Sequence, residues 1–439
     1  MKRLTKAFLT LTLVSGLILP IFSPTVKVEA ASSGNDYPIV LCHGNGGWGR
    51  DEKSGYLYWG GTVDLEQELN NKGFEVYTGV VGPYSSNWDR ACELYAYIKG
   101  GTVDYGKAHS DKFDHDRYGR TFPGLYPQWG EKDGADLEKI HLIGHSQGGP
   151  TVRLLVQLLE DGKQEELTAV LGDNPSQEQI QAAIDNGKLS PLFAGSCDDY
   201  VESVTTLASP NDGTTAGDIA AASGDFLGLF STPINGTIMD AATGQLYDRI
   251  TNFDLKLDQW SLTRKSGESF TNYFYRVMGS SMWKGTKDFS SYDLTTAGMK
   301  EMNSWVKDHE NVYYFSYSCK ATKKALLGYN QIPDSRYMNP LFAVNGIAMG
   351  AYLNPFKGIG SEWLPNDGYV NTISQDGPTL GRAYSNIVQY NGTPQIGKWN
   401  HMGLLSRTDH EDIIGRDTST EMNGFVEFYV RHLNVLKGL

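Results

Sequence analysis

The segment Gly144–Gly148 reads Gly-His-Ser-Gln-Gly and places Ser146 between two glycines, a pattern that can present a serine as a nucleophile. The chain contains 50 glycines, so the pattern can arise by chance and its surroundings must decide. An apolar run over 140–143 precedes it, and apolar residues at helical spacing over 152–159 follow it. A strand that turns sharply into a helix would expose the Ser146 hydroxyl. We interpret Ser146 as the nucleophile, with a structural serine in a glycine-rich turn as the alternative.

A serine nucleophile needs a general base, and the base needs an acid that orients it. After a nucleophile on a strand–turn–helix, the acid comes next along the chain and the histidine last. His410 lies in the polar segment Thr408–Asp412 and suits a base carried on a loop, with His401 as its rival. His432 falls in a terminal helical pattern and is better explained as a surface or packing residue. Asp367, in an Asn-Asp-Gly turn, is either a turn former or the orienting carboxylate, and the pattern leaves both open.

Two backbone N–H groups would have to stabilise the oxyanion that forms when a serine attacks a carbonyl group. One donor is expected from Gln147, at the start of the helix that follows the serine. The other is expected from the glycine-rich loop after the first strand, near Asn45. The sequence therefore predicts an oxyanion hole made by Asn45 and Gln147.

Short apolar runs alternate with helical patterns along the chain. Such alternation indicates a mostly parallel sheet with helices on both faces. No internal repeat and no linker rich in Pro, Ser or Gly divides the chain, so we expect a single α/β domain over residues 31–439. The expected strands lie at 38–42, 74–77, 140–143, 204–208 and 312–316.

Composition narrows the function classes. The formal net charge is −13, with 40% hydrophobic and 20% charged residues, which argues against a disordered chain and against nucleic acid as a partner.

Residues 1–30 combine a basic start, an apolar run and small residues before Ala31, as secretory signal peptides do. We therefore expect a secreted, extracellular protein without a stable membrane anchor. The oligomeric state and the pairing of the four cysteines stay open.

Nine short segments follow one another along the chain: Pro38–Gly44, Tyr58–Gly61, Ser85–Glu93, Gly100–Gly106, His145–Gly149, Ser203–Thr206, Asp212–Thr215, Asn366–Gly368 and Asp409–His410. In this order they resemble the secreted lipases of thermoalkalophilic bacilli and of staphylococci. The resemblance runs from about Asn35 to the end of the chain. It implies an α/β-hydrolase fold and a triacylglycerol lipase that acts on lipid esters at an oil–water interface. It also implies Ser146, Asp367 and His410 as the triad, with Asn45 and Gln147 at the oxyanion hole.

The sequence departs from this family at two positions near the expected site. Bacillus lipases usually carry Ala where Gly144 stands, whereas the staphylococcal enzymes carry Gly. The family commonly has Phe at the position of Asn45. The Asn45 N–H can still donate, but the wall offered to an acyl chain is less apolar, so the chain-length preference stays open.

The resemblance also implies a structural zinc site. Asp89, His109, His115 and Asp288 match the family's ligands, whereas the spacing of the two histidines by itself favours solvated side chains. Two imidazoles and two carboxylates suit a closed, tetrahedral and neutral zinc site. The ligands would belong to an insertion at about 84–124 and 252–300, which the metal would clamp to the core.

The resemblance also implies a calcium site. Asp412, Asp417 and the Tyr337 carbonyl match a calcium site that would anchor the segment carrying His410, although two plain acidic loop residues are the alternative. Apolar residues and glycines alternate over about 214–250, which suggests a lid that covers an acyl pocket, with an ordinary core helix as the alternative.

Other functions compete with the lipase hypothesis. A carboxylesterase or a phospholipase could use the same triad on a different ester. A non-catalytic secreted binding protein could keep a hydrolase fold without its chemistry.

Overall fold

The computed structural model describes residues 34–52, 55–134, 136–223, 254–416 and 424–439. Its centre is a seven-stranded sheet in the order β12-β13-β9-β8-β7-β1-β2, in which each neighbouring pair is parallel. This confirms the predicted α/β class. The expected signal peptide and residues 224–250 of the expected lid lie outside the described residues.

The five predicted strands are present, with bounds shifted by a few residues. Two strands that the sequence reasoning missed, β12 and β13, form one edge of the sheet. β13 contains Asn400, His401 and Gly403, and these residues break the apolar pattern that reveals the other strands. The strands are β1 (Ile39–Cys42), β2 (Val76–Gly79), β7 (Ile140–His145), β8 (Val201–Leu207), β9 (Tyr313–Lys320), β12 (Ile387–Gln389) and β13 (Trp399–Ser406).

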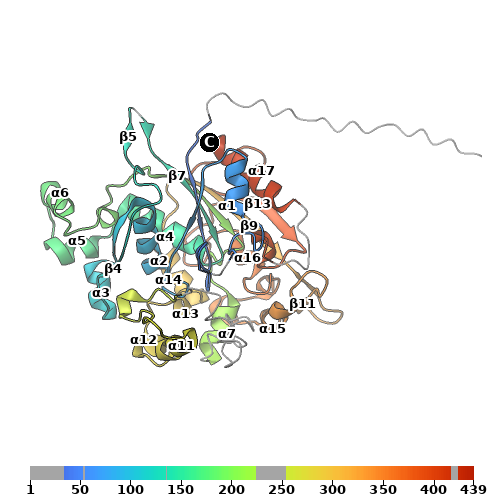
Figure 1. The fold of residues 1–439 in the computed structure, drawn as a ribbon. Coiled ribbons are helices and arrows are strands. Elements are labelled where there is room, and N and C mark those ends of the chain that lie inside the picture. Colours follow the sequence, from blue (N-terminus) through green and yellow to red (C-terminus); the bar gives the residue numbers. More distant parts are fainter. Residues whose placement is uncertain (1–33, 53–54, 135, 224–253, 417–423) are drawn as a thin grey trace, which may run out of the picture.

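Helices cover both faces of the sheet (Figure 1). On one face α2 (Asn87–Lys99) packs against α4 (Gly148–Asp161), and on the other α1 (Leu65–Asn71) packs against α17 (Phe425–Lys437). Successive side chains of β1 alternate between the two cores, because strand residues point to opposite faces in turn. A strand buried on both faces must be apolar throughout, which is why the sequence showed it as a continuous run.

Smaller elements surround the strand ends. Antiparallel pairs form between β3 (Gly101–Asp104) and β4 (Tyr118–Phe122), between β5 (Lys132–Asp133) and β6 (Asp136–Leu137), and between β10 (Thr322–Lys324) and β11 (Gln331–Pro333). In Figure 1, α12, α11, α7 and α15 follow one another from left to right at the end of the molecule opposite β5 and the C-terminus, and α3 lies at the left. The helices used below are α3 (Lys107–Phe113), α7 (Thr215–Ser223), α11 (Phe270–Met278), α12 (Ser281–Gly285), α13 (Ser290–Asp293), α15 (Ala343–Met349) and α16 (Thr372–Gln375).

The four cysteines are all described, buried and unbonded, which settles the pairing question in favour of free thiols. Burial raises the pKa of the Cys42 thiol to about 11 and keeps it protonated at neutral pH. Within the described residues, no helix has both the length and the apolar character that are needed to cross a bilayer.

Candidate active site and metal centre

Ser146 lies in a sharp turn between β7 and α4. Its φ of 54° is in the left-handed region that non-glycine residues rarely occupy. The flanking glycines are required, because a Cβ on Gly144 would lie 2.3 Å from the carbonyl of Gly148, and a Cβ on Gly148 would lie 2.2 Å from the Cys42 oxygen. This turn is the strained strand-to-helix elbow that the sequence predicted.

The structure brings Ser146, His410 and Asp367 together. His410 Nε2 lies 2.9 Å from Ser146 Oγ, and His410 Nδ1 lies 2.9 Å from Asp367 Oδ2. The Asp367 carboxylate also accepts hydrogen bonds from the N–H groups of Tyr369 and Val370 and from the Gln375 amide. Asp367 is fully buried, so these donors replace the water that an ionised carboxylate would otherwise need.

The two other candidate histidines lie elsewhere. His401 is in β13, where its ring contacts Ser318 and Gln389. His432 is buried in α17 and contacts Thr205 Oγ1 at 2.7 Å. Neither ring has a hydrogen bond to Ser146 among the described residues, whereas the His410 ring lies beside the Ser146 hydroxyl.

His145 was not identified from the sequence as a site residue. Its ring links the segment that carries His410 to Tyr58. Its Nε2 lies 2.9 Å from the His410 carbonyl oxygen, and its Nδ1 lies 2.6 Å from the Tyr58 hydroxyl. Burial lowers the pKa of His145 well below its usual value, so the ring is neutral. Nε2–H therefore donates to the carbonyl and Nδ1 accepts from Tyr58, whose oxygen accepts the Gly44 N–H at 2.8 Å.

The expected oxyanion donors, Asn45 and Gln147, lie side by side. The Asn45 side-chain amide donates to Gln147 Oε1 at 3.2 Å, and the Gln147 amide donates to the Ser85 carbonyl at 3.0 Å. Neither backbone N–H donates to an acceptor among the residues that the structure describes. Both therefore remain available to an incoming oxygen atom.

Arg90 holds the two oxyanion segments together from α2. Its guanidinium donates to the carbonyls of His43 and Gly82 and to Thr151 Oγ1, which in turn donates to the Gln147 carbonyl at 2.9 Å. Arg90 is fully buried. Its hydrogen bonds therefore fix the loop before Asn45 relative to the start of α4.

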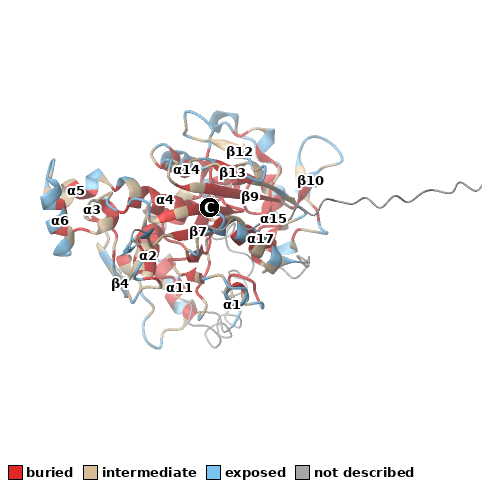
Figure 2. Ribbon diagram, turned by 90° about the horizontal axis from the view of Figure 1, so that it is seen from above, coloured by how far each residue is buried: buried red, intermediate tan, exposed pale blue. Residues whose placement is uncertain are grey.

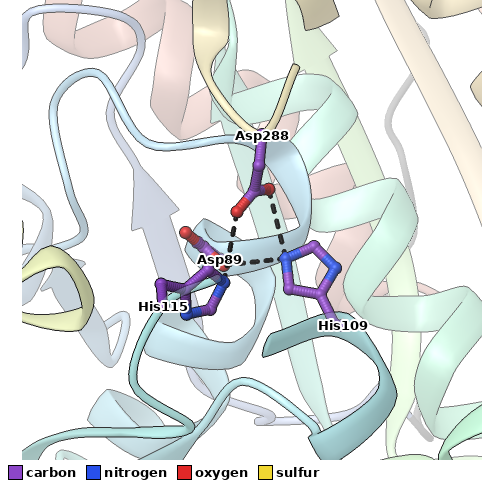
Figure 3. A group of neighbouring side chains, drawn as sticks. All are labelled: Asp89, His109, His115 and Asp288. Carbon is purple, nitrogen blue, oxygen red and sulfur yellow. Dashed lines mark ion pairs between the residues drawn. The ribbon is translucent and has the colours of Figure 1, made fainter. Parts of the chain in front are cut away.

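Asp89, His109, His115 and Asp288 converge as the family resemblance implied (Figure 3). One ligand-type atom from each lies within 4.8 Å of the others. His109 Nε2 lies 3.3 Å from Asp89 Oδ1 and 3.1 Å from Asp288 Oδ1, and His115 Nε2 lies 3.3 Å from Asp288 Oδ2. The side chains come from α2, from α3, from the residues after α3, and from the segment before α13.

The donor atoms of this cluster fit a metal ion. Asp89 Oδ1, His109 Nε2, His115 Nε2 and Asp288 Oδ2 are buried and lack hydrogen-bond partners. Buried polar atoms without partners are costly, and a bound cation would satisfy all four at once. His115 Nδ1–H donates to the Asp116 carbonyl at 2.8 Å, which leaves the Nε2 lone pair free to ligate.

Residues around the cluster support the ligands. Trp88 stacks on the His109 ring with centroids 4.8 Å apart, and Trp260 packs on His115 at 4.9 Å. The Gln259 amide donates to Asp89 Oδ2 at 2.7 Å. Trp260 and Gln259 were missed in the sequence because they lie far along the chain from the ligands that they contact.

The calcium site stays a prediction. The Asp412 carboxylate accepts the Asp409 N–H at 2.8 Å, and Asp409 accepts the Asn339 N–H at 2.8 Å. Tyr337 is described and lies two residues before Asn339, whereas Asp417 lies outside the described residues.

Of the expected lid, α7 is described, and its Asp218 accepts hydrogen bonds from Thr296.

Comparison with known proteins decides the family. The family described as "Lipase-like, C-terminal domain" matches residues 35–436. The chain belongs to this family. The domain is 48% identical to lipase 1 from Pelosinus fermentans, with a TM-score of 0.76, and the match covers 91% of this chain and 99% of that one. It is 46% identical to EstA from Clostridium botulinum, with a TM-score of 0.80 and coverage of 92% and 88%.

Curated relatives of the lipase-like domain are longer. It is 36% identical to Lipase 1 of Staphylococcus aureus over 389 residues, which are 88% of this chain and 52% of that protein. The chain thus spans about half the length of the curated relatives that it matches. The lipase-like domain shares its α/β-hydrolase fold with the solved structure of lipase 1 from Pelosinus fermentans.

The hydrogen bonds of Tyr58 predict the effect of removing its hydroxyl. We expect Tyr58→Phe to lower kcat about 10- to 100-fold with little change in KM, because the Gly44 N–H and His145 Nδ1 lose their partner beside the oxyanion loop. Steady-state kinetics on a soluble ester measures this. Tyr56→Phe is the control, because the Tyr56 hydroxyl donates to the exposed Arg416 carbonyl. Equal kinetics in the two variants would contradict the prediction.

Proposed function

We propose that this lipase-like domain is a secreted triacylglycerol lipase that hydrolyses carboxylic esters of lipids through an acyl-serine intermediate. The observation that carries the proposal is the hydrogen-bonded row from Asp367 through His410 to the Ser146 hydroxyl, with 2.9 Å at each step. Lipases related to most of this chain support the substrate class. The signal-like residues 1–30 support secretion.

The proposed reaction begins when Ser146 Oγ attacks the ester carbonyl carbon as its proton passes to His410 Nε2. The N–H groups of Asn45 and Gln147 hold the oxyanion, and Asp367 stabilises the imidazolium. The carbonyl re-forms, and the alcohol oxygen leaves with the proton from His410. Water then attacks the acyl-serine and gives a proton to His410. That proton returns to Ser146 Oγ as the fatty acid is released.

A substrate comparison tests this proposal against its alternatives. Activity is measured on a tributyrin emulsion, on a soluble short-chain ester and on a phospholipid, each over a range of concentrations. A lipase gains activity when tributyrin exceeds its solubility. A carboxylesterase prefers the soluble ester, and a phospholipase prefers the phospholipid. Failure to react with an organophosphonate would instead indicate a non-catalytic scaffold.

We also propose that the Asp89, His109, His115 and Asp288 cluster holds zinc in a structural site. Two imidazole nitrogens and two carboxylate oxygens are ligands that zinc accepts in tetrahedral coordination, and four protein ligands leave no position for a substrate. When bound, the metal would supply a cross-link rather than a reaction step. It would join α2 and α3 to the segment before α13.

Removal of the metal should lower stability. A metal present at about a thousandfold excess over its Kd stabilises a protein by about 4 kcal/mol. At about 2 °C per kcal/mol, chelation should then lower Tm by about 8 °C. Elemental analysis should find about one equivalent of zinc, and scanning calorimetry with and without chelator measures the shift.

The matched variants for this test are His109→Gln and His309→Gln. Only the first removes a cluster ligand, so it should abolish both the bound zinc and the effect of the chelator. A metal-free protein whose Tm does not respond to chelation would refute the metal site. A different metal at one equivalent would refute only its identity.

A further inference from the structure

Exposed apolar side chains are concentrated in one short part of the chain. Of the 16 large hydrophobic residues that are exposed among the described residues, nine fall between 326 and 356. Leu326 is 98% exposed, Leu327 is 85% exposed and Phe356 is 104% exposed. The nine are Leu326, Leu327, Tyr329, Ile332, Leu341, Val344, Ile347, Leu353 and Phe356. We call these nine residues the apolar rim.

The β10–β11 hairpin and α15, which carry most of the apolar rim, lie side by side. The rim occupies the β10–β11 hairpin, α15 and the 3₁₀ turn Pro355–Lys357. The Gln331 N–H donates to the Gly350 carbonyl, which fixes the hairpin to the end of α15. Figure 1 shows β11 beside α15, and Figure 2 shows the turn next to β10 extending from the body as exposed chain.

This rim is attached directly to the catalytic segments. The Asn366 carbonyl, next to Asp367, accepts hydrogen bonds from the Ala321 N–H and from Thr322 Oγ1. The Arg407 N–H, three residues before His410, donates to the Lys320 carbonyl. A lipid surface that binds the rim would therefore lie close to the proposed active site.

The charge of the same stretch is opposite to that of the chain. Between residues 320 and 357 the only acidic residue is Asp334, which pairs with Lys323 and Arg336. The five basic residues are Lys320, Lys323, Lys324, Arg336 and Lys357. The formal net charge of this stretch is thus +4, whereas that of the whole chain is −13. The positive charge is therefore local to this stretch and is not a property of the protein as a whole.

We propose that the apolar rim and its basic residues form the surface by which the protein docks on an ester-lipid interface that carries ionised fatty acid. Exposed leucine and phenylalanine side chains gain free energy on entering lipid, and nearby ammonium groups attract carboxylates at the lipid surface. The inference rests on the proposed function, because the fatty acid would be the product of that reaction.

Binding is measured without turnover, in a Ser146→Ala background, by co-flotation with triolein droplets coated with phosphatidylcholine, with or without sodium oleate. We expect Leu326→Ser with Leu327→Ser to weaken binding at least tenfold on both droplets. We expect Lys323→Gln with Lys324→Gln to weaken binding only on oleate droplets, and the difference to shrink at high salt. The control pairs are Val63→Ser with Ile396→Ser, and Lys132→Gln with Lys188→Gln, which replace exposed residues outside the rim.

Four outcomes test the docking surface and distinguish its failure from failure of the proposed function. Equal binding by rim and control variants would overturn the docking surface, even if the protein is a lipase. Reduced binding with wild-type hydrolysis of a soluble ester by the rim variants, tested with Ser146 intact, supports it. A protein that binds droplets through the rim but hydrolyses no ester would overturn the proposed function and retain the surface. Equal loss on both droplets in the lysine variant would overturn the role of fatty acid.

Discussion

Ester hydrolysis should fall by about 10⁵- to 10⁶-fold in Ser146→Ala, because the substituted protein keeps the oxyanion donors but has no nucleophile. The Ser146 hydroxyl contacts His410 Nε2, and no other side chain of the described residues hydrogen-bonds to that nitrogen. The fold should persist, because the backbone N–H and C=O of residue 146 keep their hydrogen bonds to Leu207 and Gly149. The rate constant is measured on a soluble ester, and circular dichroism checks the fold.

A serine of ordinary environment provides the control for this experiment. Ser304→Ala removes an exposed hydroxyl that bonds to the Glu301 carbonyl, and it should leave the rate unchanged. An organophosphonate should lose its leaving group and add the mass of its phosphonyl group to a peptide that contains Ser146, in the wild type and in the control but not in Ser146→Ala. Wild-type activity in Ser146→Ala, or a label on another residue, would remove the basis of the proposed mechanism.

Asp367→Asn should lower kcat by about 10⁴-fold while KM changes little. Asp367 Oδ2 accepts from His410 Nδ1, and an amide in its place would favour the tautomer that cannot accept the Ser146 proton. Stability should change less than activity, because the amide oxygen of Asn can still accept the N–H groups of Tyr369 and Val370. Steady-state kinetics and calorimetry on the same sample separate the two effects.

Asp161→Asn is the matched control, because Asp161 is a half-exposed carboxylate that pairs with Lys307 at the surface. Surface pairs of this kind contribute about 0–1 kcal/mol to stability and nothing to the reaction. A loss of activity in Asp367→Asn that parallels its loss of stability would show that the residue is only a turn former, the alternative that its Asn-Asp-Gly context allows.

The elbow of Ser146 could be predicted from sequence because its causes are local. A strand, a serine and glycines at fixed spacing determine backbone conformation over a few residues, and the close approaches at Gly144 and Gly148 show why other residues are excluded. The central strands were equally readable, since burial on both faces demands continuous apolar runs. The strand β13 was missed because its polar residues hide that signal.

The residues that contact Ser146 could not be identified from local sequence. Sequence left His401 beside His410 and left Asp367 as either a turn former or an acid. These ambiguities concern residues up to 264 positions apart, and no local pattern specifies which loops meet at the end of a sheet. The tertiary structure places His410 and Asp367 in one hydrogen-bonded row with Ser146, which is why we propose them as base and acid. It also shows His145 and Tyr58 as the link between that row and the loop that carries Asn45.

The metal cluster and the apolar rim likewise separate what the sequence determines from what the tertiary structure determines. The sequence supplied ligand types, and the resemblance supplied their identity, but only the folded chain brings α2, α3 and the segment before α13 to one point. The rim residues look like ordinary core residues in the sequence, because hydrophobicity does not state whether a side chain will find a partner. Sequence determined the local conformations and the chemical groups of this protein, whereas packing between distant segments decided which groups meet and which stay exposed.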